Sequence, residues 1–484
     1  MSQRRLLPLS ILAAMICFIP LGDVPAGGQT TTPIDVGSQL QLMWDDVLID
    51  SMQGLELKLH SPRSAEIVIE KDKPWEDSTM YDPTVIKDGD LYRMWYRTNF
   101  NSAPFYTGYA ESSDGINWTK PDLGLFEVNG SKENNIVWSS GEDRKLGYVL
   151  SIFKDENPAA KPEEQYKGVS TIAGGEGAGM YGLVSPDGIH WTRVGDKPML
   201  TGGLFDAHNI VLWDAPREQY LAYARGFFGP IRHIRRASSK DFVNWTPLEY
   251  INLGEGELEQ LYKNAATPYY RRPDILLMFP KRFMESRKPD PKWPYPGVSD
   301  VVFMFSRDTV HWDRRFREAF IRPGLDQRNW HERAIEAGPT LVPTGPGEMS
   351  LYYMEHYRTD DVMIRRGVLR EDGIASIHAK FAGGEFVTKP LVFQGNRLTI
   401  NYSTSAAGSV QIELQDAAGN PIEGYTLADC GEVYGDEIAY LVKWKGSGDM
   451  SSLSGRKIRL KVAMKDADLF SFRFSENESN GNVR

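Results

Sequence analysis

Cysteine is nearly absent from this chain of 484 residues, which contains Cys17 and Cys430 alone. Cys17 lies in an apolar N-terminal segment that is expected to be removed, so the mature chain keeps a single cysteine. One cysteine cannot form an intrachain disulfide, and the sequence has no Cys/His cluster of the kind that holds a structural metal. We therefore predict a fold stabilised by packing, with no cofactor and no metal; a single ion in a channel stays an open alternative.

The sequence also lacks a basic block and a phosphate-binding glycine loop. The formal net charge is −10, which disfavours binding to a large polyanion, so we expect no nucleic-acid partner. The stretch Gly174-Gly-Glu-Gly-Ala-Gly179 is rich in glycine, but it does not lie between a strand and a helix as a phosphate loop requires. It is interpreted as a surface loop.

Residues 1–26 have the features of a signal peptide. Arg4 and Arg5 are followed by a largely apolar run from Leu6 to Leu21, and small residues precede a cleavage point after Ala26. We expect a secreted or periplasmic protein with no membrane span after cleavage. An uncleaved membrane anchor is the alternative.

Aromatic residues are abundant, at 11 % of the chain, and some of them mark a repeat. Four copies share a serine, an aspartate two residues later and a tryptophan in register. They are Ser112-Ser-Asp-Gly-Ile-Asn-Trp118, Ser185-Pro-Asp-Gly-Ile-His-Trp191, Ser239-Lys-Asp-Phe-Val-Asn-Trp245 and Ser306-Arg-Asp-Thr-Val-His-Trp312. A degraded fifth copy, Arg370-Glu-Asp-Gly-Ile-Ala-Ser376, has lost the tryptophan.

Each copy predicts a β-hairpin in which Asp-Gly turns with positive φ and the tryptophan begins the return strand. Phe and Thr replace the glycine in two copies, so we expect those turns to differ in type. Copies recur at roughly 50 to 75 residues, enough for one four-stranded sheet each. Five copies predict an all-β, five-bladed β-propeller over residues 38–380, with a β-helix or a sandwich as the alternative. The segment Gln41–Ile49 is the candidate strand that closes it.

The pattern changes after about residue 380. Residues 397–402, 409–414 and 457–462 alternate apolar and polar side chains and have no repeat tryptophan. We predict a C-terminal β-sandwich over 381–475, followed by a polar tail at 476–484.

Carboxylates stand at the starts of the predicted inner strands, where a propeller binds small ligands. Asp82, Asp206 and Glu336 come from three different repeats. Glycosidic bonds are cleaved by a pair of carboxylates, one acting as nucleophile or base and the other as proton donor. We expect Asp82 as base or nucleophile, Asp206 as a stabilising acid and Glu336 as the donor; the structural alternative is that each merely caps a turn.

Further polar and aromatic residues near these strand starts are candidate sugar contacts. They are Trp75, Tyr81, His208, Asn264, His331, Glu332 and Arg235. Arg235 lies in a basic stretch, residues 231–236, that would suit a sugar carboxylate or sulfate, with a salt bridge between blades as the alternative.

The repeated hairpins, the start Tyr81-Asp82-Pro83 and the trailing sandwich resemble the five-bladed glycoside hydrolases of families 32 and 43, and in particular a divergent bacterial secreted group that is similar to family 32. The resemblance implies a nucleophile at Asp82. Other motifs of family 32 are absent: Tyr81 replaces an asparagine, no Arg-Asp-Pro is present and no glutamate precedes a cysteine. The family's functional residues are therefore carried over at Asp82 alone.

Together these observations predict a secreted glycoside hydrolase that acts on a poly- or oligosaccharide. The alternative is a non-catalytic carbohydrate-binding propeller, which the missing motifs favour. A lyase or a phosphorylase is a third reading, and a phosphorylase would need a basic phosphate pocket.

Overall fold

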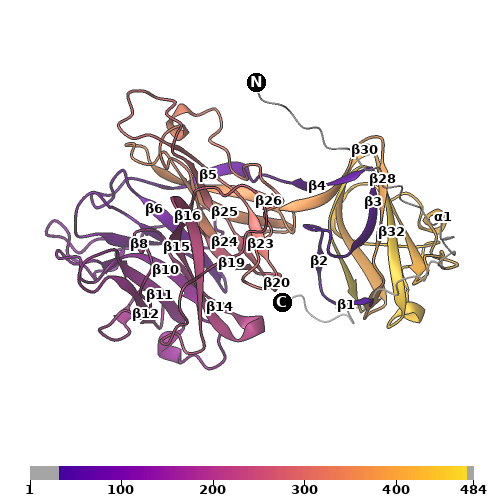
Figure 1. The fold of residues 1–484 in the computed structure, drawn as a ribbon, viewed down its shortest axis with the longest axis horizontal. Helices are drawn as coiled ribbons and strands as arrows, with labels where there is room; N and C mark the ends of the chain where they lie inside the picture. The colour runs from indigo at the N-terminus through magenta and orange to yellow at the C-terminus, as the bar shows by residue number, and fades with distance from the viewer. Residues whose placement is uncertain (1–31, 477–484) are drawn as a thin grey trace, which may run out of the picture.

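A computed structural model describes residues 32–476 of the chain, which are almost entirely β (Figure 1). The α-helical content of this part is the short α1 (Leu427–Cys430). The predicted signal peptide, 1–26, lies outside the described residues, as does the predicted tail beyond residue 476. In the described range, no helix has both the length and the apolar character that crossing a membrane would need.

The larger lobe consists of small antiparallel sheets that follow one another along the chain. The first contains β6 (Tyr81–Asp88), β7 (Leu91–Arg97), β8 (Tyr106–Ser112) and β9 (Ile136–Ser139). The second contains β10 (Tyr148–Lys154), β11 (Tyr166–Ile172), β12 (Gly179–Ser185) and β13 (Thr192–Arg193). The third contains β14 (Ile210–Asp214), β15 (Gln219–Phe228), β16 (Ile231–Ser239) and β17 (Glu249–Tyr250). The last contains β24 (Glu336–Gly345), β25 (Glu348–Glu355), β26 (Met363–Arg370) and β5 (Arg63–Glu70).

Between the third and last sheets, three bent strands form two half-sheets. One is β18 (Leu261–Lys263), β21 (Lys281–Met284) and β22 (Val298–Val301). The other is β19 (Ala266–Tyr269), β20 (Arg272–Met278) and β23 (Met304–Ser306). Two of the bends lie at Ala265, whose φ is 49°, and at Pro280, which has no N–H to donate to a ladder; the third lies at residues 302–303, between β22 and β23.

The first strands of these units contact one another in a closed circuit. β6 contacts β10, β10 contacts β14, β14 contacts β19, β19 contacts β24, and β24 contacts β6 again. Residues that begin these strands are therefore brought towards one another although they are far apart in the sequence.

The repeated motif forms a turn at the end of the third strand of a sheet. In the second copy, Asp187 Oδ1 accepts hydrogen bonds from the backbone N–H groups of Ile189 and His190, both at 2.9 Å. Trp191 Nε1 donates to the Gly188 carbonyl at 3.0 Å. The expectation that the copies without glycine form a different turn is wrong. Phe242 and Thr309 have φ of 68° and 75°, close to the glycines they replace, because the same serine and aspartate acceptors fix the backbone.

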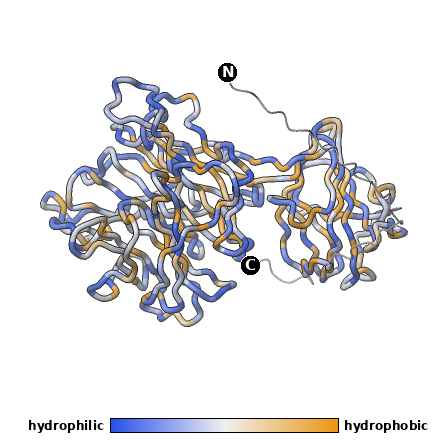
Figure 2. The backbone as a smooth tube through the Cα atoms, in the orientation of Figure 1, coloured by the Kyte–Doolittle hydropathy of each residue, from blue (hydrophilic) through white to orange (hydrophobic). Residues whose placement is uncertain are grey.

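The smaller lobe is one ten-stranded sheet around its own apolar core. From the C-terminal part of the chain it takes β27 (Ala375–Ala379), β28 (Gly384–Thr388), β29 (Leu391–Phe393), β30 (Arg397–Asp416), β31 (Asp436–Leu441) and β32 (Lys457–Ser475). From the N-terminal part it takes β1 (Ile34–Gly37), β2 (Gln41–Leu42), β3 (Ile49–Gln53) and β4 (Leu55–Leu59). Apolar positions alternate with hydrophilic ones along this lobe (Figure 2), as a sheet with one buried face requires.

The closing strand differs from the predicted one. Residues 41–49 do not pair with the last repeat: β2 pairs with β32, and β3 with β28. β5 instead pairs with β26 and completes the last small sheet. The reason is local composition, because Val68 and Ile69 supply buried apolar side chains beside β26, whereas Met43 and Leu48 pack into the core of the smaller lobe.

Candidate functional site

Two buried carboxylates that are far apart in the sequence meet on one lysine. Lys263 Nζ lies 2.8 Å from Asp82 Oδ1 and 2.5 Å from Glu336 Oε1. The exposed fractions of the three side chains are 2 % or less. Asp82 stands at the start of β6, Lys263 at the end of β18 and Glu336 at the start of β24, so the circuit of first strands produces this contact.

A second group of side chains surrounds the pair. Lys281 Nζ contacts both Glu336 Oε2 and the Tyr81 hydroxyl. Arg97 Nη1 lies 3.7 Å from Asp82 Oδ2, and its guanidinium carbon is 4.3 Å from the centroid of the Tyr81 ring. Tyr81, predicted as a sugar contact, is thus buried between cations.

The charges set the protonation of Asp82. Burial alone would raise its pKa, but the charges of Lys263 and Arg97, together with the hydrogen bond from Lys263, outweigh burial and hold the pKa of Asp82 below its ordinary value. Burial lowers the pKa of Lys281 to about 8, against the opposing charge of Glu336.

Asp82 has an unusual backbone conformation, and His208 lies beside its carboxylate. Asp82 has a φ of 56°, in the left-handed region that non-glycine residues rarely occupy. His208, just before β14, is buried, and its Nδ1 lies 3.5 Å from Asp82 Oδ1. Of the predicted residues, the structure therefore brings together Asp82, Glu336, Tyr81 and His208.

Asp206 is held apart from the buried pair. Its side chain is 51 % exposed and forms an ion pair with Arg225 Nη2. It lines a cavity of about 550 Å³ with Phe100, Phe105 and other residues. Within residues 32–476, Asp206 forms no hydrogen bond or ion pair with Asp82 or Glu336. The side chain that points inward from this loop is His208.

Three other predicted sugar contacts have structural partners. Trp75 Nε1 donates to Asn135 Oδ1 at 2.9 Å. Asn264 Nδ2 donates to the Tyr223 carbonyl at 3.1 Å, and its Oδ1 accepts from the Ala266 N–H. Arg235 donates to the Gly202 carbonyl at 2.7 Å and lies against the ring of Tyr250. Each of these side chains forms a hydrogen bond with a neighbouring strand or loop.

Glu332 and His331 lie beside the larger lobe's arginines. Glu332 is 2 % exposed and accepts from Arg358 Nη1 at 3.0 Å while Arg333 contacts its other oxygen. His331 stacks on Trp293 with a centroid distance of 3.9 Å. Both side chains thus have partners within the larger lobe.

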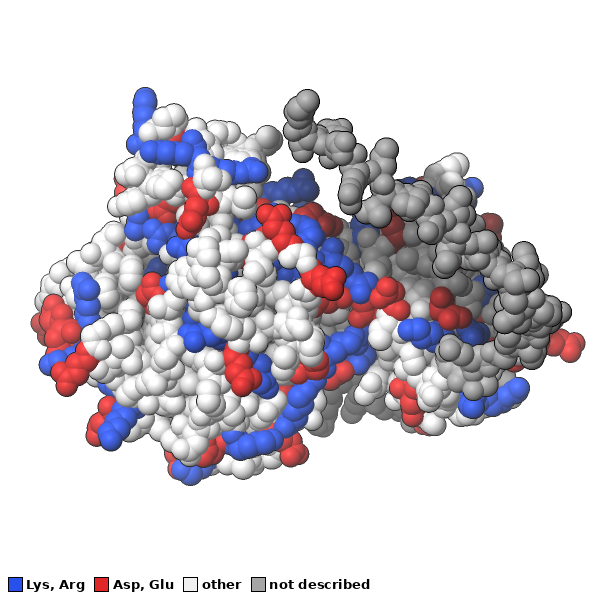
Figure 3. Space-filling model, in the orientation of Figure 1, with Lys and Arg blue, Asp and Glu red and all other residues white. Residues whose placement is uncertain are grey.

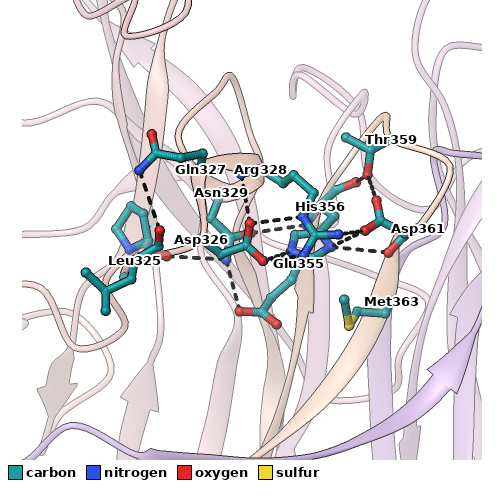
Figure 4. Close-up of polar contacts among 12 residues, drawn as sticks. Leu325, Asp326, Gln327, Arg328, Asn329, Glu355, His356, Thr359, Asp361 and Met363 are labelled. Carbon is teal, nitrogen blue, oxygen red and sulfur yellow. Dashed lines mark hydrogen bonds and ion pairs between the residues drawn. The ribbon is translucent and has the colours of Figure 1, made fainter.

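The segment that carries Tyr357 and Arg358 is fixed by a buried histidine. His356 Nε2 lies 3.0 Å from Asp326 Oδ2, and His356 Nδ1 lies 3.2 Å from Asp361 Oδ2 (Figure 4). The Thr359 hydroxyl donates to the His356 carbonyl at 2.7 Å. The ring of Tyr357 packs against Tyr81 at 5.2 Å, so this loop lies over the site.

Sequence reasoning missed the cations of the site, above all Lys263, Lys281 and Arg97. A signal for Lys263 was present: Lys263-Asn264 precedes its strand as His208-Asn209 precedes β14, and both asparagines accept a backbone N–H nearby. A comparison of strand starts that considers only acidic residues does not include this shared basic position. Lys281 and Arg97 lie in second strands, where no such alignment applies.

No family model matches the chain. Two curated relatives, both described as uncharacterized proteins of Mycobacterium tuberculosis, are 40 % identical over 119 residues. The match covers 23 % of this chain and spans only 33 % of the length of either relative.

Solved structures similar to this chain include glycoside hydrolases. One described as a glycoside hydrolase is 15 % identical, with a TM-score of 0.43 over 64 % of this chain and 92 % of that one. A glycosyl hydrolase from Bacteroides ovatus is 13 % identical, with a TM-score of 0.41 over 68 % and 97 %. An N-acetylgalactosamine deacetylase from F. plautii is 16 % identical, with a TM-score of 0.43 over 64 % and 94 %. The sequence resemblance stated above and two of these structures name the same kind of protein, glycoside hydrolases.

Proposed function

We propose that this chain is a five-bladed β-propeller with a C-terminal β-sandwich that hydrolyses glycosidic bonds of a poly- or oligosaccharide outside the cytoplasm. The closed circuit of first strands supports the propeller, with the two half-sheets counted as one bent blade. The N-terminal sequence of residues 1–26 supports export.

One observation carries the enzymatic proposal: Asp82 and Glu336 are buried and meet on the same lysine, Lys263. The low pKa of Asp82 keeps it ionised, as a nucleophile or base must be. Two neighbouring carboxyl groups, one of them held ionised, are what acid–base cleavage of an acetal uses.

The proposed roles follow from this arrangement. Asp82 acts as nucleophile or base; its Oδ2 accepts no hydrogen bond within the described part of the chain. Glu336 protonates the leaving oxygen. Asp206 acts indirectly, by orienting Arg225 at the side of the site.

The burial of the pair favours a second candidate, a non-catalytic carbohydrate-binding propeller. Lys263 and Lys281 neutralise both carboxylates, and neither acid is more than 2 % exposed. Such a centre would hold the inner strands together while the surface above it binds a glycan.

The test is a screen of the mature protein against polysaccharides and aryl glycosides. Asp82→Asn and Glu336→Gln should each lower kcat by about a hundredfold or more. Asp90→Asn and Glu133→Gln, matched changes at exposed carboxylates, should leave turnover unchanged. Glycan binding without turnover by the wild type would establish the second candidate instead.

A further inference from the structure

A set of arginines and tyrosines lies against the buried carboxylate pair, and of these only Arg225, through its contact with Asp206, enters the roles proposed above. This arginine–tyrosine cluster consists of Arg225, Tyr262, Arg333, Tyr357 and Arg358. The guanidinium carbon of Arg225 is 5.0 Å from the centroid of the Tyr262 ring, and that of Arg333 is 5.9 Å from it. Arg333 and Arg358 lie 5.2 and 5.4 Å from the ring of Tyr357.

The cluster is in direct contact with the centre of the site. Lys281 Nζ, which contacts Glu336, is 5.1 Å from the Tyr262 ring centroid. Tyr357 packs on Tyr81, the neighbour of Asp82. A ligand held by the cluster would therefore lie beside the carboxylates.

Positive charge in the cluster exceeds the negative charge that balances it. Arg333 and Arg358 share a single carboxylate, that of Glu332, which is 2 % exposed. The side chains of Arg333 and Arg358 are 23 % and 25 % exposed, so both are partly accessible to a ligand. Two cations on one buried anion leave a net positive charge at the surface of the site.

Arg225 has donors with no acceptor. Its side chain is 6 % exposed, and Nη2 pairs with Asp206. Within residues 32–476, its Nε and Nη1 have no hydrogen-bond partner, and the same holds for Nε of the similarly buried Arg97. Unpaired donors on a buried charged group cost free energy, and an oxyanion is the ligand that satisfies them, in the two-point geometry that guanidinium favours.

We infer that the arginine–tyrosine cluster binds an oxyanion carried by the saccharide, a carboxylate or a sulfate ester next to the bond that is cleaved. The inference rests on the proposed function for its location and names the substrate class: acidic rather than neutral saccharides. The tyrosine rings provide faces for the sugar, while Arg225, Arg333 and Arg358 bind the charged group.

The test measures binding separately from hydrolysis. Galacturonate, glucuronate, galactose 6-sulfate, inorganic phosphate, galactose and glucose are titrated into the full chain at constant ionic strength, with calorimetry as the readout. The acidic sugars should bind at least tenfold more tightly than the neutral ones, and added salt should weaken only the former. Arg225→Gln and the less buried Arg358→Gln should each weaken uronate or sulfate binding by about tenfold. Arg456→Gln, at an exposed position away from the site, should not.

Equal affinity for acidic and neutral sugars, or unchanged uronate and sulfate affinity in both site variants, would overturn the inference. Inorganic phosphate that binds as tightly as the acidic sugars and is needed for a neutral sugar to bind would also overturn it, since the anion would then be separate from the saccharide. The two proposals fail separately: turnover of neutral glycans that depends on Asp82 keeps the hydrolase and removes the acidic substrate. Arginine-dependent binding of acidic sugars without turnover keeps the oxyanion site and removes the hydrolase.

Discussion

Lys263 and Asp82 form a buried ion pair at 2.8 Å between β18 and β6, two strands that belong to different sheets. Loss of the lysine would leave buried carboxylate charge uncompensated. We expect Lys263→Met to lower the free energy of unfolding by about 3–5 kcal/mol, measured by denaturant titration. Lys445→Met, which removes the ion pair between the exposed Lys445 and Asp429, should leave the free energy of unfolding nearly unchanged.

Because Lys263 and Asp82 contact each other, substitutions at these two positions should not act independently on stability. Asp82→Asn combined with Lys263→Met should destabilise the protein by less than the sum of the single changes, because each removes the other's partner. Additive effects would contradict a direct interaction.

Lys281 predicts a rise in stability at alkaline pH. Burial lowers its pKa to about 8 from an ordinary 10.5, so the unfolded chain binds more protons than the folded one between these values. The contribution of this group is therefore fully present above about pH 10.5 and is lost as the pH falls through about 8. The free energy of unfolding of the wild type, minus that of Lys281→Met, should increase from pH 8 to pH 10. A difference that stays flat or falls would refute the assignment.

The turn motif predicts a loss of stability when its aspartate is removed. Asp187 accepts two backbone hydrogen bonds, and Asp187→Ala should cost about 1–2 kcal/mol, as the loss of a helix-cap aspartate does. Burial would raise the pKa of Asp187, but hydrogen bonds from His190 and Ile189 lower it to about 2. The stabilisation is thus present above pH 4 and lost as the pH falls towards 2. Asp196→Ala, at an exposed position, is the matched control, and Tm is measured by thermal unfolding. An equal change in Tm in Asp187→Ala and Asp196→Ala would show that the turn does not stabilise the protein.

His356 predicts a local effect on the loop at residues 356–361. His356→Asn keeps a residue that tolerates the observed φ of 61°, but its side chain is too short to join Asp326 to Asp361. We expect a destabilisation of about 1–3 kcal/mol and faster tryptic cleavage after Arg358, followed by mass spectrometry. Unchanged cleavage would show that the bridge does not hold the loop.

Much of the β architecture could be predicted because the repeat carries its own chemistry. A serine, an aspartate and a tryptophan at fixed spacing specify a turn, and the turn ends a strand in each of the four intact copies. Phe242 and Thr309 escaped prediction because the acceptors around them, not the residue type alone, fix their φ.

The site was predictable only in part. Asp82 and Glu336 stand at strand starts, where strand direction decides where a side chain points. Asp206 lies in the irregular segment before β14, which has no periodicity to say whether it or His208 points inward. The lysines were hidden for another reason: their role is to balance buried charge, which exists only once the strands are assembled. The surface does not mark the site either, because positive and negative side chains are mixed over the face shown in Figure 3.

The pairing of β5 with β26, and of β1 to β4 with strands beyond residue 374, has a consequence for biosynthesis. Residues 34–70 are made early, yet every strand they will join lies beyond residue 362. The larger lobe can be completed only after β26 has been made and the smaller lobe only after β32, so the apolar Val68 and Ile69 stay exposed until at least residue 370 has left the ribosome.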